Sequence, residues 1–128
     1  MILGVDLGQR TTGLAVSHGT LASPYKTIFH KNINQALASV TKAVEDEQID
    51  TVVVGFVEGQ IKPFFEKFAQ QLKSQNSNLN VVLWDETLTS RQATESMVKL
   101  GVKKHKRAKK EHEVAAALIL QSYLDSSE

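Results

Sequence analysis

Residues 2–8 read Ile-Leu-Gly-Val-Asp-Leu-Gly, a short apolar segment with one carboxylate near its centre. This pattern predicts a first strand over Met1–Leu7. A carboxylate among apolar strand residues is costly to bury without a partner, so Asp6 requires a metal ion, a cation or several hydrogen-bond donors. Gly4 and Gly8 leave room beside it for a ligand or for another backbone. The alternative is that Asp6 caps the turn that follows the strand.

The rest of the chain alternates between the spacings of strands and helices. The run at 51–56 is apolar and β-branched, which is typical of a strand buried on both faces, and 81–84 repeats it. Pro24 confines the third strand to an edge or a bulge. This order favours one α/β domain over residues 1–128, with a mixed sheet covered by helices. The further predicted elements are strands over 12–17, 20–29, 51–56 and 81–84, and helices from Ile33 to before Ile49, over 61–72, from Thr89 to Gly101 and over about 109–124.

Composition excludes several classes of protein. The 128 residues contain no cysteine, which rules out disulfides, thiolate metal sites and a cysteine nucleophile. The longest continuous apolar run, Val114–Leu120, is far shorter than a membrane-spanning helix requires. The first residues lack the pattern of a signal peptide. We therefore expect a soluble cytoplasmic protein with no membrane association.

A second pair of acids, Asp85 and Glu86, directly follows the predicted strand at 81–84. If that strand runs parallel to the first, its carboxyl end lies near Asp6, and ligands gather at such strand ends. Successive strand residues face opposite sides, so only one of the two acids is expected to point the same way as Asp6. Two carboxylates from neighbouring strand ends can hold one divalent ion. Alternatively, one of them caps the following helix.

The last predicted helix begins near Glu111, His112 and Glu113. Acids at a helix N-terminus compensate the helix dipole and pair with nearby cations, which is one interpretation of this group. In the other, one or more of them reach the site of Asp6 and Glu86 as a third ligand. Imidazole suits manganese or zinc better than magnesium, which prefers oxygen. The remaining histidines show no ligand spacing and are expected on the surface: His18, His30 and His105.

The positive charge is concentrated in one segment. The formal net charge is +1, but residues 103–110 carry six cations and no acid, whereas nine cations face fourteen acids elsewhere. Such a run fits a footprint for phosphates or a solvated face. Aromatic residues are few and not interleaved with the cations, which favours backbone or shape recognition over base stacking. The expected phosphate contacts are Arg10, Lys103, Lys104, Lys106, Arg107, Lys109 and Lys110.

Five motifs, taken in order, resemble one known family. They are Gly4-Val5-Asp6-Leu7-Gly8, Ala22-Ser23-Pro24, Val53-Val54-Gly55, Val82-Leu83-Trp84-Asp85-Glu86-Thr87-Leu88-Thr89 and Ala115-Ala116-Ala117-Leu118-Ile119-Leu120-Gln121. These residues are similar to the YqgF family of RuvC-like bacterial proteins, which are described as Holliday junction resolvases and as pre-16S rRNA nucleases. The similarity runs over essentially the whole chain.

The resemblance implies an RNase H-like fold: a five-stranded mixed sheet of three antiparallel strands and two further parallel strands, flanked by helices. It also implies an acidic triad that binds Mg²⁺ or Mn²⁺ for phosphodiester hydrolysis. Carried over to this sequence, the first two acids are Asp6 and Glu86, while the third position falls on His112. Two further departures are Thr87 in place of the family's arginine and a shortened loop at 57–61.

We therefore expect a divalent-metal-dependent nuclease with Asp6, Glu86 and His112 as catalytic and metal-binding residues. The resemblance favours processing of the 5′ end of pre-16S rRNA in ribosome biogenesis, with a ribosomal precursor particle as a further partner and a monomer or weak homodimer as the working form. One alternative is a Holliday junction endonuclease that acts on branched DNA. Another is an RNA-binding assembly factor with weakened catalysis. Residues 6–13 also resemble the first phosphate loop of actin-like ATPases, but those folds need a second such domain.

Overall fold

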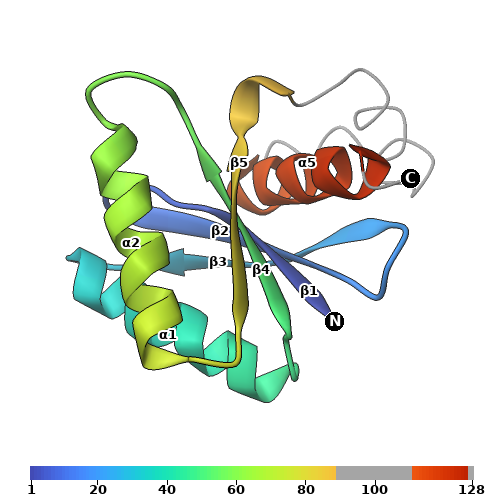
Figure 1. Cartoon of the computed structure of the whole chain (residues 1–128), viewed down its shortest axis with the longest axis horizontal. Coiled ribbons are helices and arrows are strands. Elements are labelled where there is room, and N and C mark those ends of the chain that lie inside the picture. Colours follow the sequence, from blue (N-terminus) through green and yellow to red (C-terminus); the bar gives the residue numbers. More distant parts are fainter. Residues whose placement is uncertain (89–110, 127–128) are drawn as a thin grey trace.

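The computed structural model describes residues 1–88 and 111–126. These residues form a five-stranded sheet with the strand order β3-β2-β1-β4-β5 (Figure 1). β1 is antiparallel to β2 and parallel to β4, which in turn is parallel to β5. The bounds are β1 Ile2–Asp6, β2 Thr11–Ser17, β3 Ala22–Phe29, α1 Ile33–Asp46, β4 Thr51–Phe56, α2 Lys62–Gln75, β5 Asn80–Asp85, the 3₁₀ turn η1 Glu86–Leu88 and α5 Glu111–Ser126.

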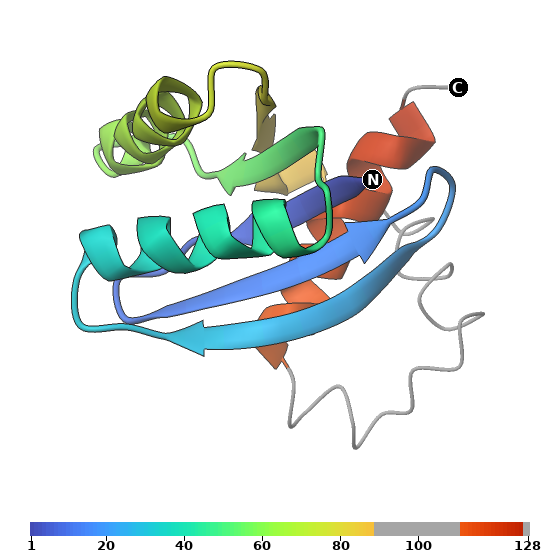
Figure 2. The same cartoon turned by 90° about the horizontal axis from the view of Figure 1, so that it is seen from below.

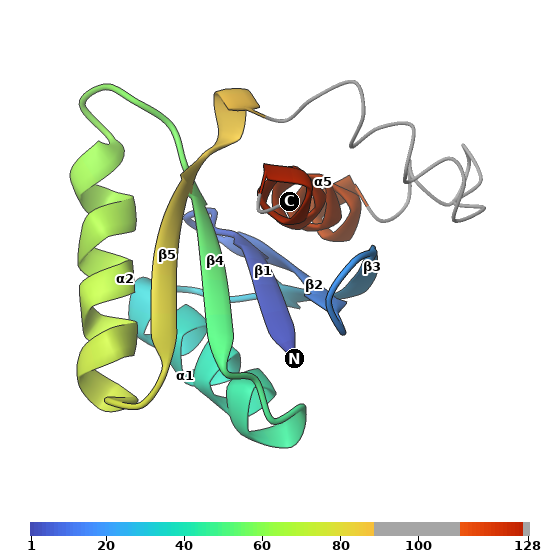
Figure 3. The ribbon, with the colours of Figure 1, turned by 45° about the vertical axis from the view of Figure 1, so that its right-hand side comes forward.

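The helices cover the two faces of the sheet unequally. α1 and α2 lie on one face, and α5 lies on the other (Figures 1 and 3). α5 packs chiefly on β1, β2 and β3, and Figure 2 shows it crossing behind the long hairpin of β2 and β3. No helix among the described residues is long and apolar enough to cross a membrane.

Successive side chains along each strand point to opposite faces of the sheet, one covered by α1 and α2 and the other by α5. On β1, Leu3 and Val5 belong to the core under α1 and α2, whereas Gly4 and Asp6 face α5. On β4, Val52 and Val54 join the first core, and Val53 packs under α5. The sheet therefore separates a large apolar core from a smaller one, and Asp6 lies on the side of the smaller core.

Small residues let α5 approach the sheet closely. A Cβ atom at Gly4 would lie 2.7 Å from Cβ of Leu120 and 2.9 Å from the carbonyl oxygen of Ala116, so the glycine of the first strand makes room for a helix. Gln121 is buried on the same helix; its Oε1 accepts a hydrogen bond from the backbone N–H of Ala22 (2.9 Å). These contacts fix the rotation and height of α5 over the strands.

Most predicted elements are confirmed, with small shifts of their ends. Pro24 lies on the edge strand β3, next to a register shift opposite Leu14 and Ala15, as its lack of an N–H requires. β5 was predicted to be buried on both faces, but it lies at an edge of the sheet and is only partly buried. The predicted helix from Thr89 to Gly101 and the basic segment at 103–110 lie outside the described residues.

The prediction that His30 lies on the surface is wrong. His30 is 6% exposed, and its Nε2 lies 2.8 Å from Oγ1 of Thr12, which is itself buried on β2. Burial lowers the pKa of His30, which favours the neutral ring. The physical reason is a side-chain partner on the neighbouring strand, which the local sequence around His30 does not reveal. His18 is exposed, as predicted, and His105 lies outside the described residues.

Candidate metal and nucleic-acid site

Asp6 and Glu86 meet at the carboxyl ends of β1 and β5, on the face covered by α5. Asp6 ends β1, and Glu86 follows the last residue of β5. β4 lies between these two strands, and a Cβ atom at its Gly55 would come within 3.2 Å of the Oε1 atom of Glu86. The missing side chain at Gly55 therefore lets the Glu86 side chain lie across β4, where it hydrogen-bonds with Asp6.

The two carboxyl groups perturb each other strongly. Burial raises the pKa of Asp6, opposed by the hydrogen bond from Glu86 and by the nearby charge of His112. Burial and the negative charge of Asp6 raise the pKa of Glu86 to about 7. Two partly buried carboxyl groups this close either share a proton, which leaves one of them neutral, or are both ionised with a cation between them. Their oxygen donors fit a hard divalent ion such as Mg²⁺ or Mn²⁺, which is often held by one or two carboxylates plus water and substrate phosphate.

The first turn of α5 lies directly over the strand next to Asp6. Gly13 of β2 is the register partner of Asp6, and a Cβ atom at Gly13 would collide with the backbone carbonyl of His112. This contact places His112 near Asp6, where its charge opposes the burial that raises the pKa of that carboxyl. Nε2 of His112 lies 3.7 Å from Oε1 of Glu111, and both side chains are accessible to solvent.

Glu113 is engaged elsewhere, although the sequence left it open as a ligand. Its side chain is 8% exposed, and its Oε2 accepts a hydrogen bond from Oγ1 of Thr27 (3.1 Å). Thr27 is the register partner of Gly13, so Glu113 is held two strands away from Asp6. Of the three residues that begin α5, His112 is the one that acts on Asp6.

The structure therefore brings the predicted set together only in part. Asp6 and Glu86 are in contact, and His112 is their neighbour. Over residues 1–88 and 111–126, no group of three or more acidic or histidine side chains is arranged so that it could hold one metal ion.

Asp85 faces away from this pair, as strand alternation predicts. Its Oδ1 accepts hydrogen bonds from the backbone N–H of Thr87 (2.9 Å) and from Oγ1 of Thr87 (2.8 Å). Asp85 therefore caps η1, in the manner of the capping interpretation, and metal binding by Glu86 stays a prediction.

Arg10 lies exposed in the turn between β1 and β2, beside the carboxyl end of β1. Its carbonyl accepts a hydrogen bond from the backbone N–H of His30 (3.0 Å), which ties this turn to the end of β3. The six predicted cations of the basic segment all lie outside the described residues: Lys103, Lys104, Lys106, Arg107, Lys109 and Lys110.

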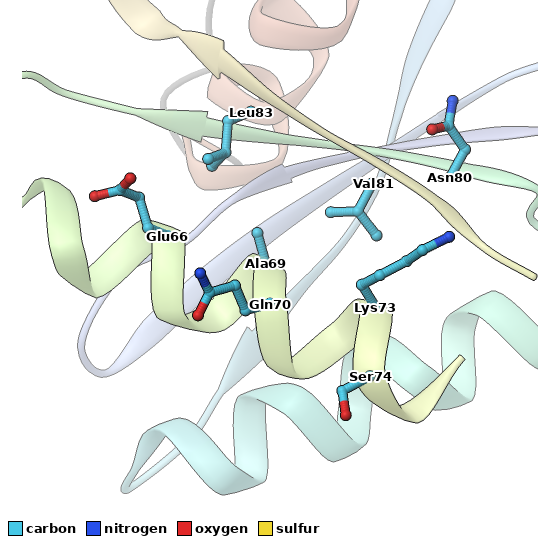
Figure 4. A pocket seen from close by; sticks show the side chains of 8 residues that line it. All are labelled: Glu66, Ala69, Gln70, Lys73, Ser74, Asn80, Val81 and Leu83. Carbon is cyan, nitrogen blue, oxygen red and sulfur yellow. The ribbon is translucent and has the colours of Figure 1, made fainter. Parts of the chain in front are cut away.

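A cleft of about 510 Å³ lies away from these residues, between α2 and β5 (Figure 4). The Nζ atom of its lining residue Lys73 donates to the backbone carbonyls of Ser77 and Leu79, so this charge is already engaged. The other lining residues are Glu66, Ala69, Gln70, Ser74, Asn80, Val81 and Leu83. The cleft is on the α2 side of the sheet and does not include Asp6 or Glu86.

Three residues shape the site without chemistry of their own, and no such role was predicted for them from the sequence. Gly13 leaves room for the α5 backbone, and Gly55 leaves room for the Glu86 side chain. Thr27 donates the hydrogen bond that holds Glu113. A glycine inside a strand is a known sign of close approach, so the two glycines carried a signal. Thr27 carried none, because its partner lies 86 residues away.

Comparison with known proteins agrees with this architecture. A family model described as "RuvX: Holliday junction resolvase" matches residues 1–126. Two relatives named "Putative pre-16S rRNA nuclease" are each 36% identical: one from Clostridium botulinum, with 98% of this chain and 96% of the relative aligned, and one from a Geobacillus species, with 99% of both. The fold is similar to that of T. thermophilus RuvC in complex with a Holliday junction substrate, with a TM-score of 0.71, 13% identity and coverage of 98% and 93%. The chain belongs to the RuvX family, which is the YqgF family that its motifs resemble.

Proposed function

We propose that this protein is a divalent-metal-dependent nuclease that hydrolyses phosphodiester bonds, with Asp6 and Glu86 as its metal-holding pair. The observation that carries the proposal is the contact between these two carboxyl groups, whose pKa values are both raised. Carboxyl groups with perturbed pKa values are candidates for functional sites, and the carboxyl ends of parallel strands are where ligands bind in open α/β sheets. The family membership and the names of the relatives support the same class of reaction.

Each side chain has a role that follows from its position. Asp6 and Glu86 supply the negative charge that holds the ion, and Gly55 leaves the space in which Glu86 reaches it. We include His112, whose backbone lies over Gly13, as the third member of the set, although in the described residues its side chain does not join Asp6 and Glu86 in one metal-holding group. When bound, a divalent cation orients the scissile phosphate, lowers the pKa of an attacking water and stabilises the leaving oxygen. Arg10 binds the phosphate backbone from the adjacent turn, and no protein nucleophile is needed.

The proposed substrate is the 5′ end of pre-16S rRNA, in a cytoplasmic role in ribosome biogenesis. The support is the name shared by relatives that align over nearly their full length. The basic segment at 103–110 would add contacts to the RNA backbone, and a ribosomal precursor particle is the natural setting for such a substrate. A Holliday junction is the second candidate substrate, because the family description names that activity.

The test is cleavage by the purified protein of a 5′-extended pre-16S fragment and of a synthetic four-way DNA junction. Both substrates are incubated with Mg²⁺, with Mn²⁺ and with a chelator. We expect cleavage of the RNA with either ion and none with the chelator. Asp6→Asn should lower the rate by about a hundredfold or more, because a bound metal contributes several kcal/mol to such reactions.

Asp85→Asn is the matched control. It changes a neighbouring carboxylate on the opposite side of the strand, and an asparagine can still accept the hydrogen bonds of Thr87. Its rate should stay close to that of the wild type. Cleavage of the junction alone would favour the second substrate. Tight RNA binding without divalent-dependent cleavage of either substrate would contradict the proposal and favour an assembly factor.

A further inference from the structure

The most exposed large apolar side chain in the described part of the chain is Phe29, the last residue of β3. Phe29 is 80% exposed, compared with 50% for Leu21 and 41% for Ile61. Leaving a phenyl ring in water forgoes a substantial part of the hydrophobic stabilisation that its burial would give. The next residue, His30, is buried. At this point an apolar side chain is therefore exposed while a polar one is buried, the reverse of the usual arrangement.

Strand alternation places the Phe29 ring on the face of the candidate site. Ile28 packs against the core under α1, whereas Thr27 hydrogen-bonds with Glu113 of α5. Phe29 therefore shares the face of Thr27. Asp6, Gly13 and Thr27 are register partners across β1, β2 and β3. Two strand spacings and two residues along β3 put the backbone of Phe29 roughly 12 Å from that of Asp6, at the same end of the sheet.

Two exposed cations lie in the chain segments next to this ring. Residues 7–12 and 29–35 lie next to each other at this end of the sheet, where the backbone N–H of His30 donates a hydrogen bond to the carbonyl of Arg10. They contain Arg10 and Lys31, both exposed, and no acid. A flat aromatic surface with flanking cations is complementary to a nucleotide, whose base stacks while its phosphate is neutralised.

A protein partner fits this surface less well. Phe29 is a single exposed ring, because Ile28 and His30 on either side of it pack on other parts of the molecule. A protein interface needs a contiguous apolar patch of several hundred Å², whereas base stacking needs one aromatic face. In a duplex the bases are already stacked on each other, so the ring can accept only an unpaired base.

We propose that Phe29 is a stacking platform for an unpaired base of a single-stranded segment that passes beside Asp6 and Glu86. This inference rests on the proposed nuclease function, because it assigns the strand that leads to that site. It adds a base contact to the backbone recognition expected from the cations alone. It also selects, among nucleic acids, those with a single-stranded region next to the cleaved bond.

The experiment measures binding of a short single-stranded RNA, in a chelator that keeps the RNA intact. The wild type is compared with Phe29→Ala, Phe29→Trp and Leu21→Ala. We expect Phe29→Ala to weaken binding roughly tenfold, because one base–aromatic stack contributes that order of affinity. Phe29→Trp should keep or improve it. Leu21→Ala is the matched control, because Leu21 is an exposed apolar residue at the opposite end of β3, and it should leave affinity unchanged.

A second probe carries abasic positions at matched phosphates. The wild type should prefer the RNA with bases over the abasic one, and Phe29→Ala should lose this preference. Equal binding by the wild type and Phe29→Ala would overturn the proposal. So would a drop in oligomeric mass in Phe29→Ala, because a second copy of the chain would then cover the ring.

The outcomes also separate this inference from the proposed function. Divalent-dependent cleavage with no effect of Phe29→Ala on binding would leave the nuclease in place and remove the platform. Phe29-dependent binding of single-stranded RNA without any cleavage would support the stacking platform and contradict the nuclease function.

Discussion

At the scale of single residues, the Asp6–Glu86 contact sets the electrostatics of the site. The two carboxyl groups lie on one face because one residue ends β1 and the other follows β5, and Gly55 leaves the space between them. In the absence of a cation, the pair retains a proton to higher pH than either group would alone, since burial and the neighbouring charge both favour the neutral form of Glu86. A shared proton and a divalent ion are therefore alternatives at the same place.

This pair makes the stability of the metal-free protein depend on pH. The pKa of Glu86 is raised from 4.5 to about 7 in the folded state. Its contribution to the free energy of unfolding is therefore fully present below pH 4.5 and is lost as the pH rises towards 7. Thermal unfolding in a chelator, followed from pH 4.5 to 8, should show the melting temperature of the wild type falling relative to that of Glu86→Gln. Parallel curves for the two proteins would show that the pair does not hold this proton.

At the scale of elements, the docking of α5 positions His112. The first turn of α5 lies against Gly13 of β2. The hydrogen bond between Thr27 and Glu113 links this turn to β3, and Gln121 fixes the helix further along. Glu113 is a buried acid whose hydrogen bond comes from a strand at the sheet edge. Buried carboxylates are stable only when such partners are present, so this bond holds the first turn of α5 against the sheet.

Removing the partner of Glu113 should weaken this docking. Thr27→Val keeps the size and β-branching of the side chain but leaves the buried Glu113 carboxylate without its donor. We expect the free energy of unfolding to fall by about 1–3 kcal/mol, measured by urea denaturation. Thr27→Ser retains the hydroxyl and should lose much less. If valine and serine at this position are equally stable, the hydrogen bond does not hold the helix.

The elements differ in how far they could be predicted. β4 was predicted with its observed bounds, because an apolar β-branched run between two helices has few other structures open to it. That one of Asp85 and Glu86 would converge with Asp6 also followed from parallel strand ends and alternation, whereas the choice of Glu86 came from the family resemblance. The exposure of Phe29 and the burial of His30 could not be predicted, because they depend on Thr12 of another strand and on how the described elements pack around the end of β3.

At the scale of the whole molecule, one face of the sheet is structural and the other is available for chemistry. α1 and α2 cover an apolar core on the first face, and the cleft between α2 and β5 contains an already engaged lysine (Figure 4). On the second face, α5 packs chiefly on β1, β2 and β3, while Asp6 and Glu86 lie at the carboxyl ends of β1 and β5. We therefore expect a nucleic acid to approach the two acids from the face of α5.

The central claim is that Asp6 and Glu86 hold a divalent ion, and calorimetric titration with Mn²⁺ tests it most directly. At pH 8 the Glu86 carboxyl is available as a ligand, because this is above its pKa of about 7. We predict binding by the wild type that is weakened at least tenfold in Asp6→Asn and in Glu86→Gln, since losing a ligand costs more than losing a supporting hydrogen bond, which alone costs 10–100-fold. Asp85→Asn should bind nearly as well as the wild type. Absence of binding in the wild type, or binding that is the same in all four proteins, would contradict the claim.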